Sequence, residues 1–224
     1  MVKLSVFGIL RFLDFFSLKY SFFVLYGAAL IGVVDSTMKM LIQVDAKVVI
    51  AFSTTVQMNF ALFVVFTMSS LSGEVLNLAL TNHMLTASIL FFIADIVLVR
   101  FNSREFFFIS GLHAALPIFS AALLFSLINQ INFPGFLGFV LDVAFAVYVL
   151  PGYPLTSFIL FFFLFSIEHL YIFYFFLKIC FGVSMRYSQV AFRDLSLAES
   201  LLFVYLLSVS IFWGLFPAVL VSAH

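Results

Sequence analysis

The residue of this sequence best placed to handle a proton is a carboxylic acid in the middle of an apolar stretch. Asp142 lies eight residues after Pro134, within the run 133–150. An ionised side chain at the centre of a lipid bilayer costs at least about 2.5–3.5 kcal/mol, so it needs a partner, water or a function. The Pro134-Gly135 pair favours a broken helix, because irregular backbone at membrane depth persists only beside a protein-lined cavity. We therefore favour proton handling for Asp142 over a satisfied structural carboxylate.

The second candidate is a histidine in a polar neighbourhood. His83 follows Thr81 and Asn82 and precedes the small residues 86–88. Small side chains let helices approach closely. Since histidine titrates near neutral pH, His83 is suited to relay protons. A hydrogen-bonded packing role fits the same pattern equally well, so the spacing leaves both interpretations open.

The other charged residues fit structural roles. Glu168, His169 and Lys178 share the run 155–181, and we favour a structural ion pair for them. Charges near the ends of apolar runs are expected to be solvated or to reach toward the lipid headgroups. These are Arg11, Asp14, Lys19, Arg100, Arg104, Glu105, Arg186, Arg193 and Asp194.

No motif indicates a metal, a nucleotide or a redox cofactor. The single cysteine, Cys180, lies in an apolar run, which indicates an inert packing residue. The sequence has no CxxC, HExxH, GxGxxG or phosphate-loop pattern, and four scattered histidines with one cysteine form no metal-ligand pattern. We expect no bound cofactor and no metal in this chain.

Composition places these residues in a membrane. Of the 224 residues, 65% are apolar and 9% are charged, whereas a soluble globular protein has about a quarter of its residues charged. Ten basic residues balance ten acidic ones, which argues against a nucleic-acid partner and against a basic membrane-surface peptide. Lipid and other helices are the expected surroundings of most side chains.

The lengths of the apolar runs predict the elements that position the candidate residues. A spanning helix needs about 20 mostly apolar residues. The runs that plainly meet this length are 20–42, 48–71, 75–99, 108–127 and 197–221; two less simple ones are 133–150 and 155–181. Residues 1–16 indicate part of a helix whose beginning is missing. The sequence thus predicts a single all-α membrane domain over 1–224, a polytopic bundle of about six to seven helices with one broken helix at 133–150.

Several strings match known sequence patterns, in order and over almost the whole chain. KLSVFGILRF from Lys3 is similar to K-x-x-x-Y-G-L-L-R-F, and QVDAKVVIAFS from Gln43 is similar to Q-T-D-x-K-R-L-I-A-Y-S. NHMLTASILF from Asn82 follows A-H-G-L-x-S-x-x-L-F, and RFNSRE from Arg100 follows R-x-x-T-R-D. These patterns resemble the second half of the antiporter-like subunit 4 of respiratory NADH dehydrogenase (complex I), whose bacterial counterpart is chain M.

The rest of the chain continues the resemblance. LPIFS from Leu116, PGFLGFVLD from Pro134 and DLSLAE from Asp194 are similar to M-P-x-x-S, P-G-x-x-x-F-x-G-E and D-L-x-x-R-E of the same family. Subunits 2 and 5 carry lysine where this chain has Asp142, so the resemblance favours subunit 4. Asp142 is one methylene shorter than the usual glutamate. Gln57 stands where the family usually has a histidine of the proton relay, and it cannot titrate.

The resemblance implies a function and the residues that carry it. Lys3, His83 and Asp142 would line a hydrated axis that carries protons in response to quinone reduction elsewhere in the complex, with no redox chemistry in this chain. Supporting residues would fix loops, join half-channels to the aqueous side and stand at the start of the last helix. These residues are Lys47, Arg100, Arg104, Glu105 and Glu199.

The resemblance also implies partners and a location. In the family, each half of the subunit is a five-helix inverted repeat, and both halves form one proton path. We therefore expect a separate chain that carries the N-terminal half, other membrane-arm subunits and membrane lipids as partners. The mitochondrial inner membrane is expected rather than a bacterial plasma membrane. Two alternatives stay open: a structural subunit that no longer conducts, as Gln57 hints, and a cation/proton antiporter chain of the same ancestry.

Overall fold

The computed structural model describes residues 6, 8–9, 19–67, 72–103, 105, 109–149, 155–182 and 194–217. Regular structure in these ranges is helical, apart from an isolated bridge between Asp45 and Glu105. The prediction of an all-α bundle is therefore confirmed. Most of the helix expected over 1–16, including Lys3, lies outside the described residues.

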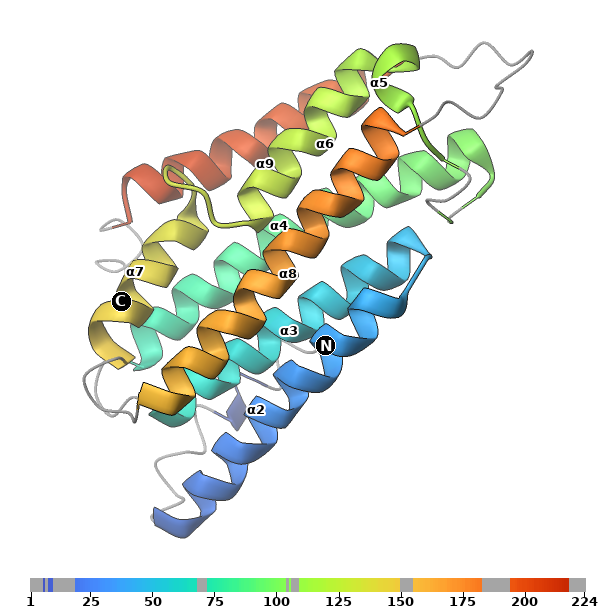
Figure 1. The fold of residues 1–224 in the computed structure, drawn as a ribbon. Coiled ribbons are helices and arrows are strands. Elements are labelled where there is room, and N and C mark those ends of the chain that lie inside the picture. Colours follow the sequence, from blue (N-terminus) through green and yellow to red (C-terminus); the bar gives the residue numbers. More distant parts are fainter. Residues whose placement is uncertain are drawn as a thin grey trace.

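The helices run lengthwise beside one another as a bundle (Figure 1). In chain order they are α2 (Lys19–Ile42), α3 (Ala46–Thr67), α4 (Ser72–Phe101), α5 (Leu112–Ala115), α6 (Pro117–Gln130), α7 (Leu137–Val149), α8 (Leu155–Phe181) and α9 (Leu197–Leu215). α4 contacts α3, α6, α7 and α9, while α8 contacts α2, α5 and α6. Polar residues on α4 and α8 can therefore face the same interior from two sides.

The prediction that residues 108–127 form one spanning helix is wrong. The structure divides it into the single turn α5 and the helix α6, which begins at Pro117 and extends to Gln130. Proline suits the first position of a helix, because its missing N–H would have no partner there. α6 has 14 residues, so at 1.5 Å per residue it is about 21 Å long and too short to cross a bilayer alone.

The break predicted at Pro134-Gly135 is confirmed, but it separates α6 from α7 instead of lying inside one helix. α6 ends in the middle of the bundle, and α7 continues toward the other end (Figure 1). Two residues in the intervening loop have positive φ, Asn132 at 56° and Gly135 at 103°. Left-handed backbone ends a helix, so α6 and α7 together form one broken crossing.

Apolar side chains fill the interior and also cover much of the outside. The largest buried cluster joins α3, α4, α6, α8 and α9, with Ile89, Leu116 and Phe119 at most 1% exposed. Outward-facing residues include Ile31 and Val99, which are 70% and 82% exposed. Such apolar surface in a monomeric chain indicates contact with lipid or other membrane helices.

Two stretches among the described residues are long and apolar enough to cross a membrane unaided. They are Val75–Phe101 and Leu197–Leu215. Ala46–Leu62 and Pro117–Gln130 are apolar but shorter.

Candidate functional site

Polar side chains from five helices meet inside the bundle beside the break. We call this set the buried polar cluster. Its members come from α3, α4, the end of α6 with its following loop, α7 and α8. Asn82, His83, Gln130, Asn132 and Glu168 are buried, while Gln57 and Asp142 are half-buried. Because buried polar groups are normally hydrogen-bonded, the contacts inside the cluster indicate what it can do.

Asp142 is held by the loop that breaks the helix. The Asn132 side-chain amide donates to both carboxylate oxygens, at 3.2 Å to Oδ1 and 3.1 Å to Oδ2. Asn82 on α4 donates from Nδ2 to Asn132 Oδ1 at 3.5 Å. A line of amides therefore connects α4 to the carboxylate on α7.

Gly138 leaves the space in which the Asn132 side chain reaches Asp142. A Cβ atom built at Gly138 would collide with Oδ1 and Cγ of Asn132 and would lie 3.0 Å from Asn82 Nδ2. The first turn of α7 is thus open where Asn132 enters it. The left-handed φ of 56° at Asn132 turns the loop at the same point, and asparagine tolerates that conformation better than most residues.

A small cavity lies beside this line of amides. It measures about 20 Å³, and Gln57, Asn82, His83 and Asn132 supply its polar lining. That volume is enough for a water molecule, which needs roughly 10–15 Å³ and polar partners. His83 is 8% exposed. The structure therefore brings His83 and the residue that holds Asp142 to one cavity.

Gln57, which stands where the family usually has a histidine, lies at this site. Gln57 lines the same cavity as His83. A glutamine can donate and accept hydrogen bonds, so it can bind a water there, but it cannot exchange a proton. The substitution removes one titratable group and preserves a polar wall.

Two of the predicted site residues cannot be placed. Lys3 and Arg104 lie outside the described residues, so their assignments stay predictions. The structural ion pair favoured for Glu168 is not found among the described residues, where neither carboxylate oxygen makes a hydrogen bond of good geometry. In the part of the chain that the structure describes, Gln130 and Asp142 are the residues that interact with the Glu168 carboxyl group.

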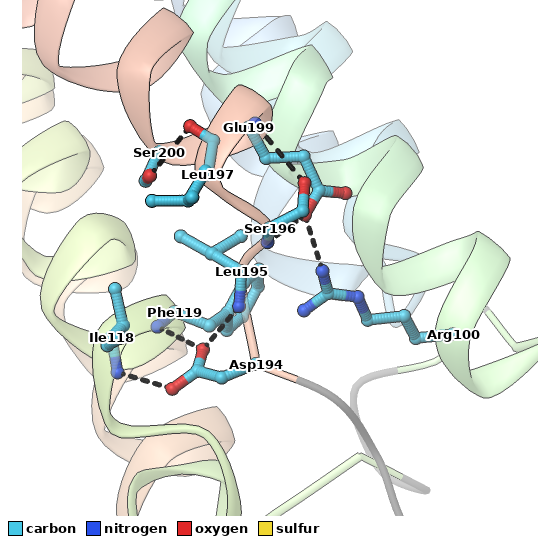
Figure 2. Close-up of polar contacts among 9 residues, drawn as sticks. All are labelled: Arg100, Ile118, Phe119, Asp194, Leu195, Ser196, Leu197, Glu199 and Ser200. Carbon is cyan, nitrogen blue, oxygen red and sulfur yellow. Dashed lines mark hydrogen bonds and ion pairs between the residues drawn. The ribbon is translucent and has the colours of Figure 1, made fainter.

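The remaining supporting residues lie at helix ends. Arg100, in the last turn of α4, pairs with Glu199 on α9 at 2.7 Å. Glu199 also completes a capping box with Ser196, which closes the start of α9. Figure 2 shows both contacts on the Glu199 side chain.

Asp194, which was expected to be a solvated loop charge, also connects helices at this end of the bundle. Its carboxylate accepts hydrogen bonds from the backbone N–H groups of Ile118 at 2.8 Å and Phe119 at 3.0 Å, in the first turn of α6 (Figure 2). A negative charge at a helix N-terminus satisfies free N–H groups and interacts favourably with the helix dipole. We call the side chains of Arg100, Asp194, Ser196 and Glu199 the end clasp, since they tie α4, α6 and α9 together.

A second set of contacts between helices lies at the turn between α2 and α3. Lys47 Nζ contacts Asp95 Oδ1 on α4 at 3.1 Å, with both side chains more than a third exposed. Asp45 caps α3 through the Lys47 N–H at 2.9 Å, and its backbone bridges to that of Glu105. These contacts connect the turn between α2 and α3 with α4 and with the segment that follows it.

Two amide residues of the cluster, Gln130 and Asn132, were not predicted from the sequence. Gln130 and Asn132 lie in the string NQIN, which follows the apolar part of α6. Both are buried, at 1% and 6% exposed. Several polar residues directly before a Pro-Gly pair, between two apolar runs, were the available signal.

The family described as NADH:quinone oxidoreductase/Mrp antiporter, transmembrane, matches residues 1–169 of the 224. The chain belongs to this family. The matched part includes all seven residues of the buried polar cluster.

Curated relatives agree with the subunit that the sequence resembles. NADH-ubiquinone oxidoreductase chain 4 of Acanthamoeba castellanii is 32% identical over 145 residues, which are 62% of this chain and 29% of the relative. Chain 4 of Chondrus crispus is 28% identical over 146 residues, or 64% of this chain and 30% of the relative. The resemblance to subunit 4 is therefore confirmed, although the alignment spans less than a third of each relative's length.

Solved structures agree on the fold. A chain of respiratory complex I from Thermus thermophilus has a TM-score of 0.83 at 20% identity and covers 95% of this chain and 45% of its own length. A chain of the Mrp complex from Dietzia sp. DQ12-45-1b has a TM-score of 0.82 at 17% identity, with 97% and 49% coverage. This chain thus has the fold of about half of such a subunit, as predicted.

Proposed function

We propose that this chain is a proton-translocating subunit of chain 4 type in the membrane arm of respiratory complex I, the NADH:ubiquinone oxidoreductase. The observation that carries the proposal is the Asp142 carboxylate, held at a helix break by the amide of Asn132, a residue that lines a water-sized cavity together with His83. A carboxylic acid, an imidazole and a water site in one interior are the parts that a proton relay needs. The family membership and the chain 4 relatives support the same conclusion.

In the proposed mechanism, Asp142 holds a proton and releases it toward the cavity. A water molecule in the cavity would accept a proton from one neighbour and give another to the next, so the imidazole of His83 would exchange protons with Asp142 without direct contact. Asn132 and Asn82 would orient the carboxylate and the water as the proton moves. Lys3 would supply a further titratable group on the same axis, as the resemblance implies.

The helix-end residues would keep this path aligned and joined to the aqueous side. Arg100 and Glu199 hold the ends of α4 and α9, while Lys47 and Glu105 fix the loops around α3. Arg104 is proposed for the same loop region from the resemblance alone. None of these groups would have to release a proton for the path to conduct.

The proposal includes partners and a location. Other membrane-arm subunits would cover part of the apolar outer faces, and lipid would cover the rest. The mitochondrial inner membrane is proposed because chain 4 relatives from eukaryotes resemble this chain. No redox cofactor is proposed for this chain.

A native gel of mild-detergent extracts tests membership in the complex. We expect the chain to migrate with NADH-oxidising activity and with other membrane-arm subunits, identified by mass spectrometry. Migration of the chain as a stable monomer contradicts the proposal. Migration with a complex that lacks NADH oxidation points to the antiporter alternative, which the chain 4 relatives do not favour.

The other alternative is a structural subunit that no longer conducts. It predicts a dry interior around His83 and Asp142, whereas conduction requires ordered water there. A cryo-electron microscopy map of the complex that resolves water in the 20 Å³ cavity would support conduction. A well-resolved map with an empty cavity would favour the structural role.

A further inference from the structure

A second carboxylic acid of the buried polar cluster has no part in the mechanism above. Glu168 on α8 is 1% exposed. Neither of its carboxylate oxygens has a hydrogen-bond partner of good geometry among the described residues. Burying an unpaired ionisable group in a membrane protein is costly, so such a group normally has a function.

Glu168 faces the end of α6, where other buried polar atoms also lack partners. Gln130 lies next to its carboxyl group, and Asp142 is close enough to interact with it electrostatically. Gln130 Nε2 and both side-chain polar atoms of Asn129 have no hydrogen-bond partner among the described residues. Asn129 and Gln130 are at most 1% exposed. This group of amides, next to a carboxyl group, can bind water and support the movement of a proton.

Glu168 and Asp142 reach this region from different helices. Asp142 comes from α7 and is tied to the loop by Asn132, while Glu168 comes from α8, which packs on α6. Two carboxyl groups that interact in a low-dielectric interior resist being ionised together, so the pair holds at least one proton that can be exchanged.

We infer that Glu168 is a second proton-carrying carboxyl group, which exchanges a proton with Asp142 past Gln130 and extends the path to α8. This inference rests on the proposed function. In the exchange, the O–H bond of the Glu168 carboxylic acid breaks and an O–H bond forms on the Asp142 carboxylate. Water beside Gln130 takes up one proton and gives up another, so the total charge of the pair is unchanged. No oxidant or reductant is involved.

The test uses the assembled complex in membrane vesicles and compares three variants. Glu168→Gln removes the proton site with nearly the same shape, and Glu168→Asp keeps a carboxyl group. Asp35→Asn is the control, because Asp35 forms an exposed i,i+4 pair with Lys39 on α2, outside the cluster. Proton transport per NADH oxidised is measured, together with infrared difference spectra of protonated carboxyl groups during turnover.

We expect Glu168→Gln to lose proton transport and one carboxyl difference band while the complex assembles. Glu168→Asp should restore part of the transport and show that band at a shifted position, and Asp35→Asn should match the parent. Parental transport in Glu168→Gln, or an unchanged set of carboxyl bands, overturns the inference. If Glu168→Gln does not assemble, the Glu168→Asp spectrum decides: a shifted band supports the inference, and an unshifted set contradicts it.

Asp142→Asn, run in parallel, separates this inference from the proposed function. If Asp142→Asn loses transport and Glu168→Gln keeps it, Glu168 is a packing residue and the proposed function stands. If both variants transport protons at the parental rate, both conclusions fail.

Discussion

A neutral amide holds the proposed proton carrier in place. Among the described residues, the side chain that bonds the Asp142 carboxylate is Asn132. An ion pair in a low-dielectric interior would favour the charged carboxylate strongly, because protonation would leave the cation unpaired. An amide imposes a smaller penalty, so the carboxylate can gain a proton while its position is kept. The charged pair Arg100–Glu199 lies instead at a helix end, where its role is to hold the helices together.

Replacing the carboxyl group of Asp142 is expected to stop conduction without unfolding the chain. Asp142→Asn keeps the shape of the side chain and its contact with Asn132 but cannot carry a proton. We expect proton transport to fall by at least about tenfold, since a positioned acid–base group typically contributes about 10²–10⁴-fold to a proton-transfer step. Proton uptake into vesicles, normalised to the amount of assembled complex, measures this.

Asp142→Glu is the matched control, because it keeps the carboxyl group with one more methylene. Substantial transport in Asp142→Glu and loss in Asp142→Asn would assign the effect to titration. If Asp142→Asn assembles and transports at the parental rate, Asp142 is a hydrogen-bonded packing residue.

Lys3 is expected to matter for transport more than for assembly. Lys3→Met keeps a long apolar side chain and removes the charge that the resemblance places on the axis. Proton transport should then fall more than NADH oxidation in the same vesicles. Lys39→Met on the exposed surface of α2 is the control, and it should change neither rate. An unchanged transport rate in Lys3→Met would refute the assignment and favour a side chain that reaches the membrane interface.

At the scale of helices, glycine and left-handed backbone build the break that presents Asp142. Gly138 leaves room for Asn132, and Gly135 has a φ of 103°. Gly214 on α9 lies against the same loop: a Cβ there would be 2.5 Å from the Gly135 carbonyl oxygen and 2.8 Å from the Leu137 nitrogen. α9 therefore packs directly on the irregular backbone. This cover is what a helix break at membrane depth requires, because unpaired backbone groups in lipid are costly.

A methyl group at the start of α7 should disturb this arrangement. Gly138→Ala would collide with the Asn132 side chain, which must then move away from Asp142. We expect destabilisation of about 1–3 kcal/mol, the usual cost of overpacking, together with reduced proton transport. The thermal midpoint of the purified complex and vesicle transport measure the two effects.

Gly27→Ala is the matched control, since a Cβ at that α2 position meets nothing within 4 Å. It should leave transport unchanged and the midpoint equal or slightly higher, because alanine favours a helix more than glycine does. Equal behaviour of Gly138→Ala and Gly27→Ala would show that the α7 start can accommodate a side chain.

At the scale of the whole molecule, the end clasp connects segments that are far apart in the sequence. Arg100 and Glu199 are 99 residues apart, and Asp194 bonds the start of α6, 75 and 76 residues earlier. Both ion-paired side chains are mostly buried, at 15% and 29% exposed. The clasp fixes the ends of α4, α6 and α9 (Figure 2), and α4 and α6 both carry residues of the buried polar cluster. It therefore joins two helices that carry residues of the cluster.

Breaking the Arg100–Glu199 pair should lower stability modestly. Arg100→Gln is expected to cost about 1 kcal/mol, near the upper end for partly exposed pairs. Glu199→Gln should cost a similar amount, and the double variant should cost less than the sum of the two. The double-mutant cycle is measured by thermal denaturation of the purified complex. Strictly additive losses would mean that the two side chains do not stabilise one another.

The sequence by itself determined the membrane bundle, the subunit that the chain resembles and the break at Pro134-Gly135. These follow from apolar run length, ordered motifs and turn residues, which are local properties of the chain. Only the tertiary structure decided that 108–127 divides at Leu116–Pro117, that Asn132 holds Asp142 and that Glu168 lies beside Gln130. Those facts depend on which helices pack together, and residues on α6, α7 and α8 become neighbours only when the bundle closes.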